Sequence, residues 1–316
     1  MNLSNIPVSI LLSTHNGAKY LPDLLESLLQ QTHRNWRLFL RDDCSEDNSQ
    51  EIIFNYQNRY SQKIKLLTTS QSRPPLGAAQ SFGRLLQEST GQYFMFADQD
   101  DVWHSNKIAL SLEKILLCEK QHGVETPILI HTDLTVVNDA LEPINHSYIQ
   151  HRNLDPTRNQ TNQLLLQNIV TGCTACFNLA LKDLVGNIPA TAPMHDWWLA
   201  LTASCFGAIE FIYQPTIDYR QHTQNIIGAP ASGKNISTTK ILKKLKELRK
   251  ELYLSIKQAQ TLLNLYEQQL TIEQKELLHT FATIKKNSFI KKRLLLLKYN
   301  VCFDTISRNV GLYLTI

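Results

Sequence analysis

Long apolar runs are missing from this 316-residue sequence. No stretch of 18 or more apolar residues occurs, so nothing in it predicts a membrane-spanning helix. Residues 1–16 lack the basic head and long apolar core of a secretory signal, and the six cysteines are scattered along the chain. Internal repeats and low-complexity segments are missing as well. We therefore predict a cytoplasmic globular protein in a reducing compartment.

Charge is unevenly distributed between the two ends of the chain. Residues 1–233 contain 22 acidic and 16 basic residues, a net charge of −6, whereas residues 234–316 contain 6 acidic and 16 basic residues, a net charge of +10. This contrast predicts two units in different surroundings, the second of which faces something anionic.

Short apolar runs alternate with amphipathic segments over the first 120 residues. Strands are expected at 8–14, 36–42, 64–69 and 93–98, and helices at 20–31, 49–60, 77–89 and 105–120. This alternation predicts an α/β nucleotide-binding fold, with a mostly parallel central sheet covered on both faces. Further strands are expected at 127–137 and within 168–177. A long straight helix is expected over 241–270, followed by another that starts at the capping box of Thr271 and Gln274.

Polar residues follow three of these strands, at the point where each ends. Thr14 and Asn16 follow the first strand, Asp42 and Asp43 the second, and the acidic stretch Asp98–Asp101 the fourth. Ligands of parallel α/β sheets bind at the carboxyl ends of the strands. Because Asp98 and Asp100 stand two residues apart there, they suit a divalent cation that completes its shell with phosphate oxygens and water.

Several segments together resemble a known family. VSILLSTHNGAKYLPDLLESLLQQT, LRDDCSEDNS, FADQDDVW, NIVTGCTACFN, MHDWWLAL and YRQHTQNIIGA are similar to the successive signatures of glycosyltransferase family 2, inverting enzymes with the GT-A fold that use nucleotide-sugar donors. The resemblance covers about residues 6–229. DQDDVW with HDWW and YRQH is most similar to the rhamnosyltransferase-like members, which build bacterial surface polysaccharide from dTDP-rhamnose. Relatives often carry Asn where Ser81 stands.

The resemblance implies a GT-A catalytic domain over 1–233, a basic helical region over 234–316, and a role for each matching residue. Thr14, Asn16 and Asp43 would hold the nucleoside, Asp98 the ribose, Asp100 a Mg²⁺ or Mn²⁺ ion, Asp101 the donor sugar or a metal-bound water, Asp196 would be the catalytic base, and Arg220 and His222 would hold the diphosphate. Asp43 also suits the imino N–H of a pyrimidine base by its own chemistry.

Plainer interpretations exist for several of these residues. Asp196 would also serve as a helix cap, and Arg220 as an ordinary surface arginine. The CTAC stretch at 173–176 lacks the second pair that a zinc site needs, so its cysteines are expected to be structural. Trp197 and Trp198 are expected in the core more than against a sugar ring, and His131 and Asp133 at a polar strand end more than at an acceptor.

The basic region 234–316 has two interpretations. It forms a helical bundle packed on the first unit, or it docks on anionic lipid head groups, which would suit a lipid-linked glycan acceptor. Nucleic acid is not expected, because no recognised binding motif accompanies the charge. The whole sequence thus predicts a metal-dependent inverting transferase of L-rhamnose. A UDP-hexose donor, or a nucleotide-sugar-binding protein without catalysis, is the alternative.

Overall fold

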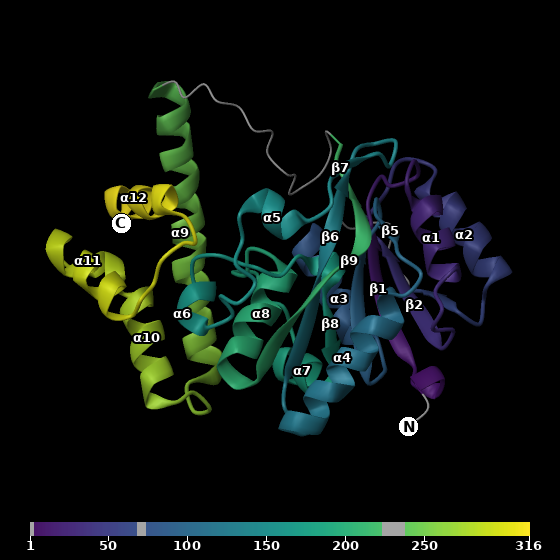
Figure 1. The fold of residues 1–316 in the computed structure, drawn as a ribbon, viewed down its shortest axis with the longest axis horizontal. Helices are drawn as coiled ribbons and strands as arrows, with labels where there is room; N and C mark the ends of the chain where they lie inside the picture. The colour runs from purple at the N-terminus through teal and green to yellow at the C-terminus, as the bar shows by residue number, and fades with distance from the viewer. Residues whose placement is uncertain (1–2, 68–73, 223–237) are drawn as a thin grey trace.

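The computed structural model describes residues 3–67, 74–222 and 238–316. A central sheet with flanking helices forms one part of the molecule, and the helices of the C-terminal region stand beside it at one end (Figure 1). The predicted boundary at 233/234 lies outside the described residues, so the division into 1–233 and 234–316 stays a prediction.

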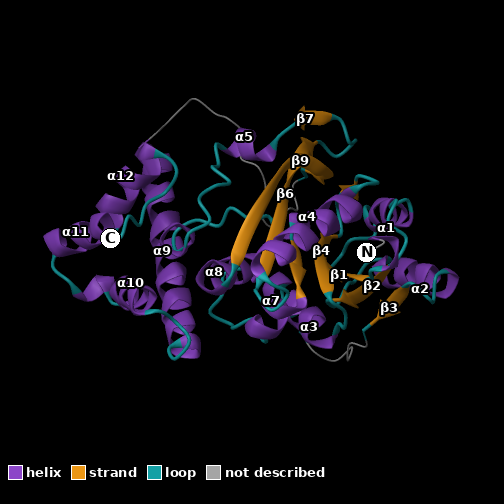
Figure 2. Cartoon of the chain, turned by 60° about the horizontal axis from the view of Figure 1, so that its bottom comes forward, coloured by secondary structure: helices purple, strands orange, loops and turns teal. Residues whose placement is uncertain are grey.

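A single sheet runs through the first part in the order β3-β2-β1-β4-β8-β6-β9-β5, with β7 paired to β6 (Figure 2). Its strands are β1 (Val8–Thr14), β2 (Trp36–Asp42), β3 (Ile64–Leu66), β4 (Tyr93–Asp98), β5 (Val102–Trp103), β6 (Ile128–Val137), β7 (Pro143–Asn145), β8 (Cys176–Asn178) and β9 (Ala208–Arg220). The half from β3 to β4 is entirely parallel, and β8 joins it antiparallel. The predicted α/β fold with a mostly parallel sheet is confirmed.

Helices cover both faces of the sheet, because its central strands bury side chains on both sides. On β1, Ile10 and Leu12 belong to one core cluster and Leu11 to the other. The helices are α1 (Leu21–Leu29), α2 (Ser49–Arg59), α3 (Ala78–Glu88), α4 (Lys107–His122), α5 (Tyr148–Arg152), α6 (Thr161–Leu164), α7 (Leu179–Val185), α8 (His195–Phe206), α9 (Thr238–Tyr266), α10 (Ile272–Ala282), α11 (Phe289–Lys298) and α12 (Ile306–Thr315). Short 3₁₀ turns lie at Leu3–Asn5, Gly172–Thr174 and Ile284–Lys286.

The C-terminal helices share a core with the sheet-bearing part. Ala259 and Leu262 of α9 are fully buried in the same cluster as Trp198 of α8. Polar contacts cross the same boundary: Nε2 of Gln274 donates to the carbonyl of Cys205 over 2.7 Å. The expected capping box of α10 is present, with Oγ1 of Thr271 accepting from the N–H of Gln274. The side of these helices that faces the sheet-bearing part therefore packs as the bundle interpretation expects.

Several segments differ from the sequence prediction. Within 168–177 only Cys176 and Phe177 belong to a strand, β8, because Gly172–Thr174 forms a 3₁₀ turn instead. β9 was not predicted, since Pro215 interrupts its pattern and its pairing with β6 shifts register near Asp133. Over the described ranges, none of the helices combines the length and the apolar character needed to cross a bilayer.

Candidate active site

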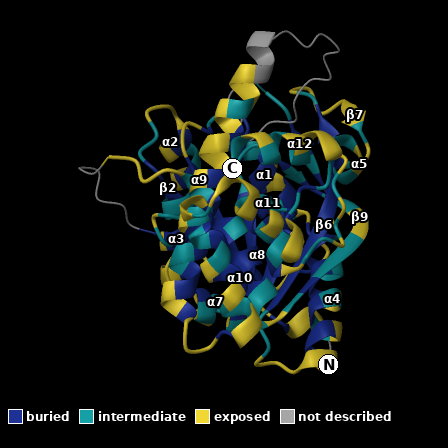
Figure 3. Ribbon diagram, turned by 90° about the vertical axis from the view of Figure 1, so that its left-hand side faces the viewer, coloured by how far each residue is buried: buried dark blue, intermediate teal, exposed yellow. Residues whose placement is uncertain are grey.

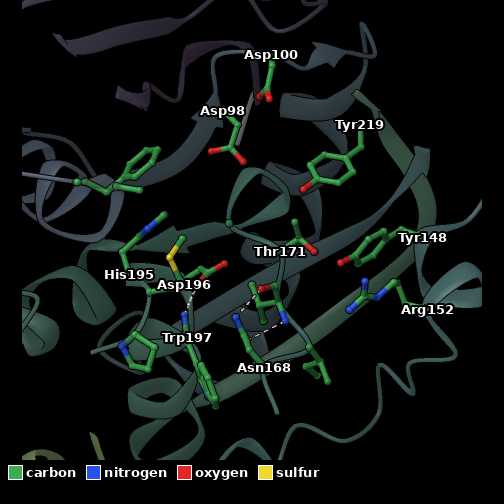
Figure 4. Close-up of a pocket in the computed structure, with 18 of the residues that line it drawn as sticks. Asp98, Asp100, Tyr148, Arg152, Asn168, Thr171, His195, Asp196, Trp197 and Tyr219 are labelled. Carbon is green, nitrogen blue, oxygen red and sulfur yellow. Dashed lines mark hydrogen bonds between the residues drawn. The ribbon is translucent and has the colours of Figure 1, made fainter. Parts of the chain in front are cut away.

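The polar strand ends meet at one edge of the sheet. Thr14 pairs with Asp42, and Ser13 with Asp98, so the ends of β1, β2 and β4 lie side by side. A cleft of about 1320 Å³ opens at this edge. Its lining contains Thr14, Asn16, Asp43, Asp98, Asp100, Asp196 and His222 from the predicted site. Segments distant in sequence thus contribute to one cavity, and Figure 4 shows part of it.

Asp43 organises one end of the cleft. Its carboxylate accepts from Nη1 of Arg41 at 2.6 Å and from the N–H groups of Leu76 at 2.9 Å and Gly77 at 2.8 Å. Burial alone would raise the pKa of Asp43, but these hydrogen bonds and the guanidinium lower it overall. Nη1 of Arg41 also donates to Oγ of Ser81, the position that departs from the family pattern.

Thr14 and Asn16 line the same end in different ways. Oγ1 of Thr14 is fully buried and has no hydrogen-bond partner among the described residues, so it is available to a ligand. Asn16 adopts a left-handed backbone with φ of 50°. Its N–H donates to Oγ of Ser45, and its side-chain oxygen accepts from the N–H of Glu46, so it fixes the turn after β2.

Asp98 and Asp100 both face the cleft. Burial, followed by the nearby charges of Asp100 and Asp196, raises the pKa of Asp98 to about 7. Oδ2 of Asp100 lies 2.8 Å from Nε2 of His222, whose ring stacks on Tyr20 at 4.6 Å between centroids. Two carboxyls that repel each other in one cleft indicate a place for a cation.

Asp101 lies behind this pair. It is fully buried and is not part of the cleft lining. Burial first, then Asp100 and Asp98, raise the pKa of its carboxyl well above the ordinary value. One ligand atom each from Asp98, Asp101 and Cys173 lies within 4.8 Å of the others. The predicted contact of Asp101 with the donor sugar or a metal-bound water does not agree with this position.

Arg220 is committed to protein partners. Nε donates to the carbonyl of Asp100 at 3.0 Å, Nη1 to the carbonyl of Asp139 at 2.6 Å, and Nη2 to Oδ2 of Asp23 at 2.7 Å. The guanidinium also lies over the ring of Tyr20. Arg220 is buried and does not line the cleft, so its position suits holding the turn of Asp100 better than gripping a diphosphate.

Asp196 lies in the first turn of α8, on the cleft wall. The N-cap of α8 is Met194, so Asp196 is not the cap, although its Oδ1 accepts from the N–H of Trp197 at 2.6 Å. A Cβ at Gly172 would lie 3.1 Å from Nε2 of His195 and 3.3 Å from Oδ2 of Asp196, so a larger residue there would require these side chains to shift by a few tenths of an ångström. Burial raises the pKa of Asp196 to about 7, against the lowering effect of the N–H groups of Trp197 and Gly172.

Apart from Trp197, the other weighed residues follow their plainer interpretations. Trp198 is fully buried in the core as expected, whereas Trp197 lines the cleft and donates from Nε1 to the carbonyl of Leu164. His131 is buried against Phe211, and burial lowers its pKa to about 3. The carboxylate of Asp133 accepts from the N–H groups that begin α5. None of the six cysteines, all of which the structure describes, forms a disulfide.

Sequence reasoning missed one wall of the cleft. Tyr148 and Arg152 of α5 and Tyr219 of β9 lie across the cavity from Asp196 (Figure 4). The rings of Tyr148 and Tyr219 meet edge to face with centroids 5.8 Å apart. The sequence offered a signal for Tyr219 as a cleft residue, because it precedes Arg220 in YRQH. The irregular segment that holds α5 offered no such signal for Tyr148 or Arg152.

The residues at the cleft fit a hard divalent cation. Asp100 offers a carboxylate oxygen on the cleft wall, a ligand that both Mg²⁺ and Mn²⁺ accept, and His222 lies beside it. The cluster behind them fits less well, because burial raises the pKa of the Cys173 thiol far above its usual range and keeps it protonated.

A sheet with acidic strand ends at a large cleft defines a GT-A type nucleotide-binding protein. The chain belongs to glycosyl transferase family 2, whose model matches residues 9–185, more than half of the chain. The dTDP-rhamnosyl transferase RfbG of Shigella flexneri is 27% identical over 235 residues, covering 71% of this chain and 75% of RfbG.

Two further likenesses bear on the donor and the fold. The UDP-Glc:alpha-D-GlcNAc-diphosphoundecaprenol beta-1,3-glucosyltransferase WfgD of Escherichia coli is 26% identical over 166 residues, covering 52% of this chain and 57% of WfgD. This chain thus spans a little over half the length of WfgD. The mannosyltransferase PcManGT from Pyrobaculum calidifontis, solved with GDP-Man and Mn²⁺, superposes with a TM-score of 0.50 at 15% identity, covering 93% of this chain and 86% of that one. This last likeness concerns the fold alone.

Proposed function

We propose that this chain is an inverting, metal-dependent glycosyltransferase that transfers L-rhamnose from dTDP-rhamnose to a bacterial cell-surface polysaccharide acceptor. One observation carries the proposal: the carboxyl of Asp196 lies in the same cleft as Asp98 and Asp100, and its pKa is about 7. A carboxyl tuned to neutral pH beside an acidic strand end suits a base working next to a nucleotide sugar.

Inversion is a single displacement, so the acceptor hydroxyl must lose its proton as the new bond forms. Asp196 takes this proton in our proposal. Its carboxylate is held by N–H groups at the start of α8, and the bare backbone of Gly172 keeps it close to the cleft wall. Asp98 stays with the ribose, in reach of the same space.

Asp100 would hold the cation, with His222 as its neighbour. A divalent cation bound there would neutralise charge on the departing diphosphate. Arg220 has a different job in this scheme from the one its motif implies: it positions the turn of Asp100 through that residue's carbonyl. The metal requirement is supported by the carboxyls of Asp98 and Asp100, which face the same cleft.

The donor assignment rests on the motifs and on RfbG, named as a dTDP-rhamnosyl transferase, which matches 71% of this chain. A UDP-hexose is the alternative, because WfgD, named for UDP-Glc, is about equally identical over a shorter stretch. A pyrimidine base suits Asp43. The carboxylate of Asp43 has four acceptor positions, of which the described residues use three, so one is left for the imino N–H of the base.

The acceptor is proposed to be carried on a lipid, and the protein to work in the cytoplasm at the inner face of the plasma membrane. The outward side of α11 supports this location. Ile290, Leu294 and Leu297 are 68%, 58% and 64% exposed at i, i+4 and i+7, and Lys291 and Lys298 are exposed beside them. Figure 3 looks onto this end of the molecule.

The test is a panel of nucleotide sugars incubated with the protein and Mn²⁺, with released nucleoside diphosphate as the readout. We expect release from dTDP-rhamnose above all other donors, and calorimetric binding of dTDP or UDP but little of GDP. Release from a UDP-hexose alone would replace rhamnose by the alternative donor. Binding of donors without any release or transfer would indicate a nucleotide-sugar-binding protein instead.

A further inference from the structure

The cleft has a second, basic end. Beyond Asp196 its lining comes from α5, α9 and the start of α12, and the charged or hydrogen-bonding side chains there are His151, Arg152, Lys244, Glu251, Ser307 and Arg308. Four of the five acids that line the cleft lie at the sheet edge or at the start of α8, and only Glu251 lies at this end. The cleft therefore changes sign along its length.

The cations at this end come from separate elements of the fold. Arg308 pairs with Glu251 at 3.0 Å and lies over the ring of Phe303 at 4.0 Å, while Arg152 lies over Tyr148 at 5.8 Å. Burial lowers the pKa of Arg308. Glu251 acts in the opposite direction, the charge of Arg152 adds to the lowering, and the pKa is lowered overall. Among the charged residues that line this end, Arg152, Lys244 and Arg308 outnumber the single acid Glu251, so the lining carries a net positive charge.

We propose that Arg152, Arg308 and Lys244 form a binding site for a phosphate or diphosphate group of the acceptor. Guanidinium groups bind phosphate oxygens with paired, charge-assisted hydrogen bonds, and an anion between them offsets their repulsion. This inference rests on the proposed function, because it takes the hydroxyl that loses its proton to Asp196 to belong to the same bound molecule. The acidic end of the cleft would repel the phosphate and so set the direction of the acceptor.

The outer side of α12 indicates which phosphate-bearing acceptor fits. Ile306, Val310 and Leu314 stand at i, i+4 and i+8 and are 84%, 54% and 65% exposed, and the stripe begins next to Ser307 and Arg308 of the cleft. An apolar chain attached to a phosphate in the cleft would meet this stripe as it leaves. We therefore favour a lipid diphosphate over a soluble sugar phosphate.

The experiment measures anion binding by the full chain, first saturated with dTDP so that the donor end is filled. Inorganic pyrophosphate and geranyl diphosphate are titrated by calorimetry. The variant Arg152→Gln/Arg308→Gln should weaken both probes at least about 10-fold, since each charge-assisted bond contributes about 1.5–3 kcal/mol. The matched control Lys285→Gln/Lys286→Gln removes two exposed positive charges of the Ile284–Lys286 turn, and it should stay within about twofold of the parent.

A second variant keeps the test informative if the double variant is poorly folded. Glu251→Gln removes the acid that lines this end and keeps the size of the side chain, so it should tighten binding of both probes. If the Glu251–Arg308 pair were purely structural, this substitution would not tighten binding. Unchanged affinity in a folded Arg152→Gln/Arg308→Gln protein, or weaker binding by Glu251→Gln, would overturn the proposal. Tighter binding of geranyl diphosphate than of pyrophosphate supports the lipid carrier. Equal binding overturns that preference and supports a soluble phosphate acceptor at the same site.

Donor hydrolysis separates this inference from the proposed function. Asp98, Asp100 and Asp196 are untouched in these variants, so hydrolysis of the preferred nucleotide sugar should continue at the parent rate. Loss of probe binding with intact hydrolysis supports both the anion site and the proposed transferase function. If the parent shows no hydrolysis but binds the probes through its arginines, the proposed transferase function is overturned and the anion-binding site stands.

Discussion

Nε2 of His222 lies 2.8 Å from Oδ2 of Asp100, although 121 residues separate the two along the chain. The contact exists because β9 runs parallel to β6 and pairs with β5, which brings its last residues to the edge where β4 ends. The carboxylate of Asp100 is thereby held in a fixed direction on the cleft wall.

Metal dependence should follow from this carboxylate. Asp100→Asn should reduce turnover at least about 100-fold with an unchanged melting temperature, because the cation that offsets the diphosphate charge loses its anchor. EDTA should abolish turnover, and added Mn²⁺ should restore it. Asp183→Asn, at an exposed acid of α7, is the matched control and should have full activity. Full turnover in EDTA would sink the metal-dependent mechanism.

Asp196→Asn separates a base from a structural carboxyl. Asn has the same size and can still accept from the N–H of Trp197, but it cannot take a proton, so transfer should fall by about 10² to 10⁴. Donor affinity and melting temperature should stay near those of the parent. Near-normal transfer would remove Asp196 from the chemistry and leave Asp98 as the next carboxyl of the cleft to test.

The pH profile should report the same group. Because burial raises the pKa of Asp196 to about 7, kcat/KM should rise with pH, reach about one-tenth of its maximum at pH 6 and about half at pH 7, and level off above about pH 8. The raised folded-state pKa also means that this group stabilises the fold at low pH and loses that contribution as pH rises from its ordinary value of 3.8 to about 7. The parent should therefore lose stability between about pH 4 and pH 7 relative to Asp196→Asn. Parallel stability curves would contradict the raised pKa.

Asp43 should matter for stability as much as for nucleotide binding. Asp43→Asn leaves the buried guanidinium of Arg41 without its carboxylate, which should cost about 3–5 kcal/mol of the free energy of unfolding in urea. Asp42→Asn is the control: its buried carboxylate accepts from Ser45 and Gln50 but pairs with no cation among the described residues, so the loss should be about 1–3 kcal/mol. Equal losses would show that the ion pair adds nothing.

Membrane docking should depend on the outward stripe of α11. Ile290→Ser/Leu294→Ser/Leu297→Ser should weaken binding to vesicles of phosphatidylcholine with phosphatidylglycerol, and added salt should weaken binding of the parent, because surface charge is screened within roughly 8 Å at physiological ionic strength. The control triple Phe54→Ser/Leu117→Ser/Val124→Ser changes equally exposed residues of the sheet-bearing part. If both triples bind vesicles alike, α11 is not the docking surface.

Local pattern predicted the donor edge of the fold well. Apolar runs gave β1, β2 and β4 their bounds, so the pattern alone assigns Thr14, Asp43 and Asp98 to one edge of the sheet. The same reasoning could not separate Asp100 from Asp101, which are neighbours in sequence. One lines the cleft and the other is buried beside Cys173, because the chain turns directly after β4.

Residues whose surroundings come from far along the chain were beyond that reasoning. The guanidinium of Arg220 is surrounded by Asp23, Asp139 and the carbonyl of Asp100, and no spacing in the sequence predicts that these segments meet. Arg152 and Arg308 lie 156 positions apart and share one cleft through the packing of α12 against α9. Periodicity describes one helix or strand at a time and carries no information on contacts between segments that are distant in the sequence.

The reversal of charge along the cleft has an evolutionary consequence. The acidic end is built from the strand ends of the sheet, whereas the basic end is built from α5, α9 and α12, which contribute nothing to the strand ends. If the two ends bind donor and acceptor as we propose, mutations in these three helices would change the acceptor without touching the residues at the strand ends. A lineage with this arrangement could then acquire a new acceptor and keep its donor.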